Sequence, residues 1–262
     1  GNTGGGVFRT TNGGTSWTLV AAGLPPSLTV RALAVDPSDP STIYAGLVAS
    51  GTQVAAVYKS VNGGASWSVA GSGVGRVTVL GLAIDPANPA TVYAATFGAP
   101  GVSKSANGGT TWANANSGLP STRVLAIATD PATPTTLYAA TFGGGVARST
   151  NGGTSWAVFG TGIIGTNVGA LAIDPATPTR LFAGTPGAGV FRTDGGAWSA
   201  ASVGLDATRV ASVVAMDGPP TPLVAAIEGG GIAVSADGTA WAAANTGLPT
   251  PRLNVLARDP ST

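Results

Sequence analysis

Residues 149–156 read STNGGTSW, and this stretch decides the fold because related blocks occur six times along the chain. The blocks end at the six tryptophans of the protein, which are Trp17, Trp67, Trp112, Trp156, Trp198 and Trp241. Successive tryptophans are 50, 45, 44, 42 and 43 residues apart. A period in this range is typical of repeat architectures, so the sequence predicts six similar structural units.

Each unit contains four short segments that favour strands. The first is apolar on both faces, as in VRALAV at 30–35, and suits a strand buried between neighbouring sheets. An Asp-Pro turn ends it, because proline cannot donate to a strand ladder. A second strand such as TVYAA at 91–95, a third strand, the tryptophan block and a fourth strand complete the unit. The pattern contains no helical periodicity and predicts an all-β fold, a six-bladed β-propeller of four-stranded antiparallel blades, with residues 1–262 as a single domain.

The repeated block has a local structural explanation. The side-chain oxygen of its Asn or Asp can accept backbone N–H groups of its own turn, while glycine supplies a positive φ. A Ser or Thr hydroxyl two residues earlier can add a bond, and the tryptophan ring can fill the gap between blades. The residues predicted to play these structural roles are the six tryptophans above together with Asn12, Asn62, Asn107, Asn151, Asp194 and Asp237.

This block resembles the Asp-box, or BNR, repeat family, whose pattern is S/T-x-D/N-x-G-x-S/T-W. Four blocks match it in full, at residues 10–17, 60–67, 105–112 and 149–156, and the resemblance extends over essentially the whole chain. The family includes sialidases, xyloglucan-cleaving glycosidases, sortilin-type receptor ectodomains and photosystem-assembly factors, all of them propellers. The resemblance implies a fold and leaves the function open, because the box is a structural element remote from the site in these families.

Composition disfavours several classes of function. Only 9% of residues are charged and the formal net charge is +1, so no strong field attracts nucleic acid. Gly, Pro, Asn and Asp interrupt every apolar run, so no membrane insertion is expected. The chain has no Cys and no His, which removes thiolate and imidazole metal sites and the Ser-His and Cys-His nucleophile systems. We therefore predict no metal and no cofactor. The few lysines among much Gly, Ser, Thr and Ala are typical of exported proteins and predict an extracellular or cell-surface location.

Few side chains remain for catalysis. Of the eleven carboxylates, six follow first strands and two belong to the repeated blocks. Glu228 is the only glutamate, and glycoside hydrolysis usually needs two carboxyl groups. Arg123, Arg209 and Arg252 precede first strands at equivalent positions and can form an anion-binding or partner surface with Glu228, although solvated rim charges are the simpler interpretation. We predict that the protein is not an enzyme.

Two further sets of residues recur once per unit. A cation precedes five of the six blocks, at Arg9, Lys59, Lys104, Arg148 and Arg192, and Val234 replaces it in the last unit. We expect the stems of these side chains to cover apolar surface while their charged heads stay solvated. Second strands carry an aromatic residue that is expected in the core, at Tyr44, Tyr93, Tyr138 and Phe182. Phe97 and Phe142 follow second strands and are expected at the surface.

The two ends of the sequence belong to the same unit. Thirteen residues separate the turn aspartate from the glycine after the second strand, as from Asp85 to Gly98, whereas the residues after Asp259 and up to Gly4 amount to seven. We therefore expect a closure blade that mixes N- and C-terminal strands and lacks its second strand, with a seam marked by Gly4, Val7, Val255 and Asp259. The strand belongs to a longer chain, is donated by another polypeptide, or is dispensable.

Three functional hypotheses follow. The first is a non-catalytic structural and interaction propeller that assembles with other protein, copies of itself included, by strand donation at the closure blade. The second is a secreted propeller that binds or hydrolyses glycans. The third is an assembly factor that binds a particular protein partner.

Overall fold

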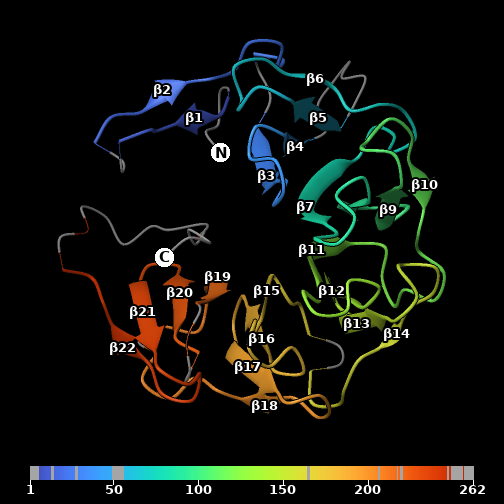
Figure 1. Cartoon of the computed structure of the whole chain (residues 1–262). Helices are drawn as coiled ribbons and strands as arrows, with labels where there is room; N and C mark the ends of the chain where they lie inside the picture. The colour runs from blue at the N-terminus through green and yellow to red at the C-terminus, as the bar shows by residue number, and fades with distance from the viewer. Residues whose placement is uncertain are drawn as a thin grey trace. The chain divides into compact units, whose positions relative to one another are not determined.

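The computed structural model describes residues 6–12, 15–26, 29–48, 56–163, 166–205, 207–216, 218, 221–246, 248 and 256. All regular structure within these residues is β-strand. The strands form five four-stranded antiparallel sheets and one two-stranded ladder, coloured in chain order in Figure 1. The fold class is a six-bladed β-propeller, and the prediction from the repeat period is confirmed.

Every complete sheet has its strands in sequence order, and the bounds are as follows. The first complete sheet contains β3 (Val30–Val35), β4 (Ile43–Leu47), β5 (Val57–Ser60) and β6 (Ser68–Val69). The next contains β7 (Thr78–Ile84), β8 (Val92–Phe97), β9 (Val102–Ser105) and β10 (Ala113–Asn114). The third contains β11 (Val124–Thr129), β12 (Leu137–Thr141), β13 (Gly145–Ser149) and β14 (Ala157–Val158).

The remaining sheets follow the same plan. One contains β15 (Ala170–Ile173), β16 (Leu181–Thr185), β17 (Gly189–Thr193) and β18 (Ser199–Ala200). The next contains β19 (Val210–Ala215), β20 (Leu223–Ile227), β21 (Gly231–Ser235) and β22 (Ala242–Ala243). The two-stranded ladder is formed by β1 (Phe8–Arg9) and β2 (Thr18–Leu19), which correspond to the third and fourth strands of a complete sheet.

The chain forms two compact units. The first comprises Gly1–Ser117, Thr122–Thr129 and Gly153–Ser155 and includes the sheets β3 to β6 and β7 to β10. The second comprises Gly118–Ser121, Asp130–Gly152 and Trp156–Thr262 and includes the sheets β15 to β18 and β19 to β22.

The core lies on the second strands, which are covered on both faces. In β12 and β16 all five residues are buried, which explains why these strands lack an alternating polar pattern. The predicted core aromatics Tyr44, Tyr93, Tyr138 and Phe182 are 1%, 1%, 4% and 0% exposed, so that prediction is confirmed. Burial raises the pKa of Tyr93 to about 12.

The Asp-Pro turns after the first strands are held by the aspartate itself. The Oδ1 atom of Asp174, whose residue is fully buried, accepts the backbone N–H groups of Ala176 and Thr177 at 2.9 and 3.1 Å. The same pair of bonds is made by Asp36, Asp85 and Asp130. These carboxylates are therefore consumed in capping turns, which satisfies amides that would otherwise be lost at the strand ends.

The seam of the closure blade is only partly visible. Gly4, Val255 and Asp259 lie outside the described residues. Val7 is half-buried, and its carbonyl accepts the backbone N–H of Val20 at 2.8 Å. The backbone N–H of Leu256 donates to Oγ of Ser212 on β19 at 3.2 Å, so Leu256 lies beside the first strand of the last complete sheet.

No helix that is long and apolar enough to cross a membrane occurs among the described residues.

Candidate interaction sites

The repeated block closes on itself through its asparagine. In the second block, Oδ1 of Asn62 accepts the Ser60 hydroxyl at 2.9 Å and the Ser66 backbone N–H at 2.9 Å, while its amide group donates to the Ser66 hydroxyl. The Ser60 hydroxyl also accepts the Gly64 backbone N–H at 2.9 Å. Comparable bonds hold Asn12, Asn107 and Asn151. The polar atoms of the block are thus used within the turn rather than offered to a ligand.

Asp194 in the shortened fifth block has different partners. Its carboxylate accepts Nε of Arg180 and Nη2 of Arg192, both at 2.9 Å, and the turn amides bond to the Thr193 hydroxyl instead. Burial opposes ionisation of Asp194, but the hydrogen bonds from the two arginines outweigh it and lower the pKa of its carboxyl group. Arg180 also contacts Asp174 at 3.3 Å. The deletion in this block shifts the carboxylate from the turn to an ion-pair network.

In the last block, Oδ1 of Asp237 accepts the backbone N–H and the hydroxyl of Thr239, and these hydrogen bonds lower the pKa of the carboxyl group.

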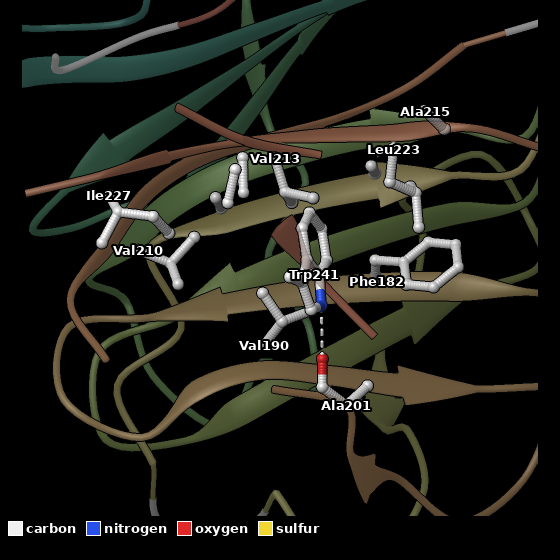
Figure 2. Packing of buried hydrophobic residues seen from close by; sticks show 13 residues of the cluster. Phe182, Val190, Ala201, Val210, Val213, Ala215, Leu223, Ile227 and Trp241 are labelled. Atoms are coloured by element: carbon white, nitrogen blue, oxygen red, sulfur yellow. Dashed lines mark hydrogen bonds between the residues drawn. The ribbon is translucent and has the colours of Figure 1, made fainter. Parts of the chain in front are cut away.

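In four of the six blocks the tryptophan is bonded to the preceding repeat. The indole N–H of Trp241 donates to the Ala201 carbonyl at 2.7 Å, as Figure 2 shows among the surrounding apolar side chains. Trp67, Trp112 and Trp198 make the same bond to Val20, Ala70 and Phe159, at 2.8 to 2.9 Å. In each case the acceptor lies three residues after the previous tryptophan. The five tryptophans from Trp67 onward are 4–7% exposed.

Trp17 does not follow the expectation that every tryptophan ring fills a gap between blades. It is 60% exposed, and so differs from the other five. The rings of Trp67, Trp112, Trp198 and Trp241 bond to the repeat that precedes them in the chain, and Trp17 belongs to the first block.

The sequence predicts that the charged heads of the cations preceding the blocks stay solvated, but three of them bond to backbone carbonyls. Nη1 of Arg9 donates to the Gly63 carbonyl at 3.1 Å, and Nζ of Lys59 donates to the Gly108 carbonyl at 3.1 Å. Nη1 of Arg192 approaches the Asp237 carbonyl at 3.4 Å. In all three cases the acceptor belongs to the block of the next unit. These side chains therefore link consecutive units, a role that each cation's position directly before a block did not reveal.

The register places four of the five cations opposite an aromatic residue. The antiparallel pairs across the second and third strands are Tyr44 with Lys59, Tyr93 with Lys104, Tyr138 with Arg148, and Phe182 with Arg192. The charged nitrogens of Lys59 and Lys104 lie 5.2 and 5.4 Å from the ring centroids of Tyr44 and Tyr93, within the range of a cation–π contact. In the last sheet both members of the pair change, and Val224 lies opposite Val234.

The β1 strand is the exposed member of the set of third strands. Phe8 on β1 is 46% exposed, whereas its counterparts Tyr58, Ser103, Ala147 and Ala233 are 0–6% exposed and Phe191 is half-buried. Among the described residues β1 pairs only with β2, while each other third strand lies between two neighbours. Phe8 therefore lies on a strand edge that, in the complete sheets, is paired with a second strand.

The predicted charged surface consists of separate contacts. Arg209 Nε and Glu228 Oε2 form an ion pair at 2.7 Å, with side chains 61% and 54% exposed. In the first compact unit, the Arg123 guanidinium lies 5.3 Å from the ring centroid of Phe97, a contact that the sequence does not predict. Phe97 and Phe142 are 42% and 41% exposed, as expected. Arg252 lies outside the described residues.

The described residues offer little for catalysis or metal binding. They contain no group of three or more His, Cys, Asp or Glu side chains arranged to hold a metal ion. One cavity of about 140 Å³ is lined by Ala56, Val57, Ala70 and residues 71–75, a set without charged side chains. Glu228, the glutamate considered for acid catalysis, is in contact with an arginine.

The sequence matches no protein-family model and no curated protein sequence. Its fold resembles those of several solved structures. The GH74 xyloglucanase from Xanthomonas campestris superposes with a TM-score of 0.73 and 18% identity, over 92% of this chain and 42% of that chain. An extracellular domain from B. thetaiotaomicron gives a TM-score of 0.72 and 15% identity, over 98% of this chain and 34% of that chain. The YCF48 protein bound to a D1 peptide gives a TM-score of 0.65 and 15% identity, over 87% and 71%.

These neighbours are β-propellers. The chain spans 34% of an ancestral GH74 enzyme and 42% of the xyloglucanase, which is less than half of either protein. At such identities the similarity shows the fold and does not carry over an activity.

Proposed function

We propose that this chain is a non-catalytic, exported structural and interaction protein of the Asp-box (BNR) type, which associates with other polypeptides, copies of itself included. The contact is the open edge of β1, which accepts an additional strand. The observation that carries the proposal is the exposure of Phe8 on a strand that pairs on one side only among the described residues. An unpaired strand edge presents backbone N–H and C=O groups to an incoming strand.

The chemistry of the described side chains supports a non-catalytic role. The carboxylates of the Asp-Pro turns accept backbone amides, Asp194 is paired with two arginines, and Glu228 is paired with Arg209. General acid–base catalysis requires a carboxyl group that is available to the substrate, with a second one at a suitable distance. We further propose that residues 1–262 act as one domain, because the same inter-unit bonds recur along the chain.

The test compares two variants at one position of β1. Because the Val7 carbonyl accepts the backbone N–H of Val20, directly after β2, and alternate residues of a strand face opposite edges, the backbone N–H of Phe8 points away from β2. Phe8→Pro removes this N–H, whereas Phe8→Ala removes the exposed ring and keeps it. We expect the parent chain and Phe8→Ala to form complexes with an added strand peptide in size-exclusion chromatography with light scattering, and Phe8→Pro to form none. A parent chain that stays monomeric at high concentration and captures no strand peptide contradicts the proposal.

A glycan-directed function is the second candidate. It is favoured by the contact between Arg123 and the half-exposed Phe97, because aromatic faces and charged groups are the usual elements of sugar recognition. Titration calorimetry with xyloglucan oligosaccharides and a reducing-sugar assay test binding and hydrolysis separately. Hydrolysis that is lost in Glu228→Gln would replace the non-catalytic proposal.

An assembly-factor role is a third candidate, in which the partner is one particular protein. YCF48, a protein of similar fold, has been solved with a D1 peptide bound. Pull-down with Phe8→Pro as the control distinguishes such a partner bound at β1 from one bound on another surface.

A further inference from the structure

We propose that the strand accepted at β1 has a defined sequence pattern, namely an aliphatic residue, an aromatic residue, Ala, and then Ala or Gly, running antiparallel to β1 with the aromatic residue opposite Arg9. This inference rests on the proposed function and specifies the chemistry of the partner. It follows from the contacts that the five complete sheets repeat between their second and third strands.

The residue opposite Arg9 is set by the cation–aromatic rule. Four third strands carry a cation at this position, and the facing residue is Tyr or Phe in all four. The last sheet carries Val234 instead, and its facing residue is Val224. The two positions thus change together within one chain. Since β1 has Arg9 at this position, an aromatic residue is the matching partner.

The site for the ring is already half-built. Arg9 binds the Gly63 carbonyl at 3.1 Å in the way that Lys59 binds the Gly108 carbonyl at 3.1 Å. In the complete sheet, the Tyr44 ring lies beside Lys59 and so close to Gly109 that an added Cβ there would lie 3.1 Å from it. Arg9 therefore makes the same backbone contact as Lys59, and an added strand would supply the aromatic residue that Tyr44 provides for Lys59.

The next two residues must be small because neighbouring strands leave no room. The residue facing the position of Phe8 is Ala in all five sheets, and each of these alanines is 0% exposed, namely Ala45, Ala94, Ala139, Ala183 and Ala225. The following residue is Ala or Gly in every sheet, and it faces the position of Val7. An added Cβ on Gly46 would lie 2.5 Å from Cγ1 of Val79, and one on Gly184 would lie 2.7 Å from Cγ1 of Val210.

Val30 lies on β3 at the position that Val79 holds on β7 and Val210 holds on β19, and it is 4% exposed. A strand added to β1 would place its fourth residue against Val30, so a bulky side chain there would clash.

The pattern also narrows the source of the strand. Within residues 1–262, the segments that fit are second strands already paired on both edges, as β8 is between β7 and β9. Releasing one would expose a buried aromatic residue and break two ladders. The strand is therefore an extended segment with this pattern outside residues 1–262, and not one of the second strands of a second copy of residues 1–262.

The probe is a fluorescent peptide with the sequence of residues 90–98, ATVYAATFG, added to the full chain of residues 1–262. We expect saturable binding by anisotropy, with amide hydrogen-exchange protection that appears at Phe8 and its neighbours. Replacing the peptide tyrosine by alanine should raise the dissociation constant about tenfold or more, because the ring contacts are lost. Replacing its second central alanine by leucine should abolish binding, whereas replacing its phenylalanine by leucine is the control and should have little effect.

A compensating pair tests the register. Arg9→Val should weaken binding of the parent peptide, and binding should recover when the peptide tyrosine is replaced by valine, which reproduces the Val224 and Val234 pair. Binding that is indifferent to both peptide substitutions would overturn the inference and leave strand acceptance in place. Assembly of residues 1–262 alone with protected β1 amides would also overturn it while supporting the proposed function. No peptide binding together with a monomeric chain would overturn both.

Discussion

The bond between Trp241 and the preceding unit can be tested by a substitution that keeps an aromatic ring. Trp241→Phe removes the indole N–H that donates to the Ala201 carbonyl at 2.7 Å, in a position where the tryptophan is 6% exposed. The carbonyl is left without this donor in an apolar surrounding of Val190, Val210 and Val213. We therefore expect a loss of folding free energy from both the missing bond and the smaller ring.

The magnitude follows from these two contributions. Leaving a buried acceptor unsatisfied costs about 1–3 kcal/mol. The atoms lost between indole and phenyl add about 1 kcal/mol through reduced burial and imperfect repacking. The sum is about 2–4 kcal/mol, which corresponds to a decrease in Tm of roughly 5–12 °C for a chain of this length.

The matched control is Trp17→Phe, because Trp17 occupies the equivalent position and is 60% exposed. Its melting temperature should lie within about 2 °C of the parent, since exposed substitutions change stability by about 0.5 kcal/mol or less. Thermal unfolding is followed by circular dichroism near 218 nm, which reports strand content. Equal shifts in the two variants, or a larger shift for Trp17→Phe, would refute the argument that the inter-unit indole bond is a source of stability.

Three further predictions concern other parts of the repeat. Gly238→Ala should lower the free energy of unfolding by about 3 kcal/mol or more, because the φ of Gly238 is +77° and the added Cβ would overlap the Phe182 ring. Gly229 has a φ of +79° with open space around it, so Gly229→Ala should cost only about 1 kcal/mol. Urea denaturation of both variants separates steric overlap from backbone strain. Asp174→Ala should cost about 2–4 kcal/mol by leaving the amides of Ala176 and Thr177 without their acceptor, and a change of about 0.5 kcal/mol or less in the free energy of unfolding, measured by urea denaturation, would show that the cap is unimportant. Arg180 and Arg192 lower the pKa of Asp194 in the folded state, so the contribution of this carboxylate to stability should be present above its unfolded pKa of about 3.9 and lost as the pH falls through the lower folded value. In melting curves between pH 2 and 6, Asp194→Asn should therefore lose less stability on acidification than the parent. Identical pH profiles of the two proteins would contradict this assignment.

The strand content and the internal plan of each sheet could be predicted from local pattern. Asp-Pro turns, glycine turns and the tryptophan blocks mark the strand ends, and each acts within a few residues of itself. Asn62 and Asp174 illustrate this, because both bond to atoms two to four residues away. The burial of the second-strand aromatics was predictable for the same reason, since their segments contain no polar alternation.

The links between units were not predictable in the same way. The acceptors of four tryptophans lie about 40 or more residues before them, and the acceptors of three cations lie about as far after them. A spacing shows that Lys59 recurs once per unit, but it does not show that its amine reaches Gly108. The shift of Asp194 from the turn to Arg180 and Arg192 likewise depends on which long side chains come within reach.

The sequence by itself determined an all-β repeat of six, its turn chemistry and its lack of imidazole and thiol groups, because these depend on residue type and on spacing along one strand. Only the tertiary structure decided which residues face one another across strands and repeats, and hence that Trp17 is exposed where its counterparts are buried and that Phe8 is more exposed than its counterparts. The reason is physical. Burial depends on whether a second surface is present to cover a side chain, and residues of the same type, such as Trp17 and Trp67, cannot carry that information in their own neighbourhood.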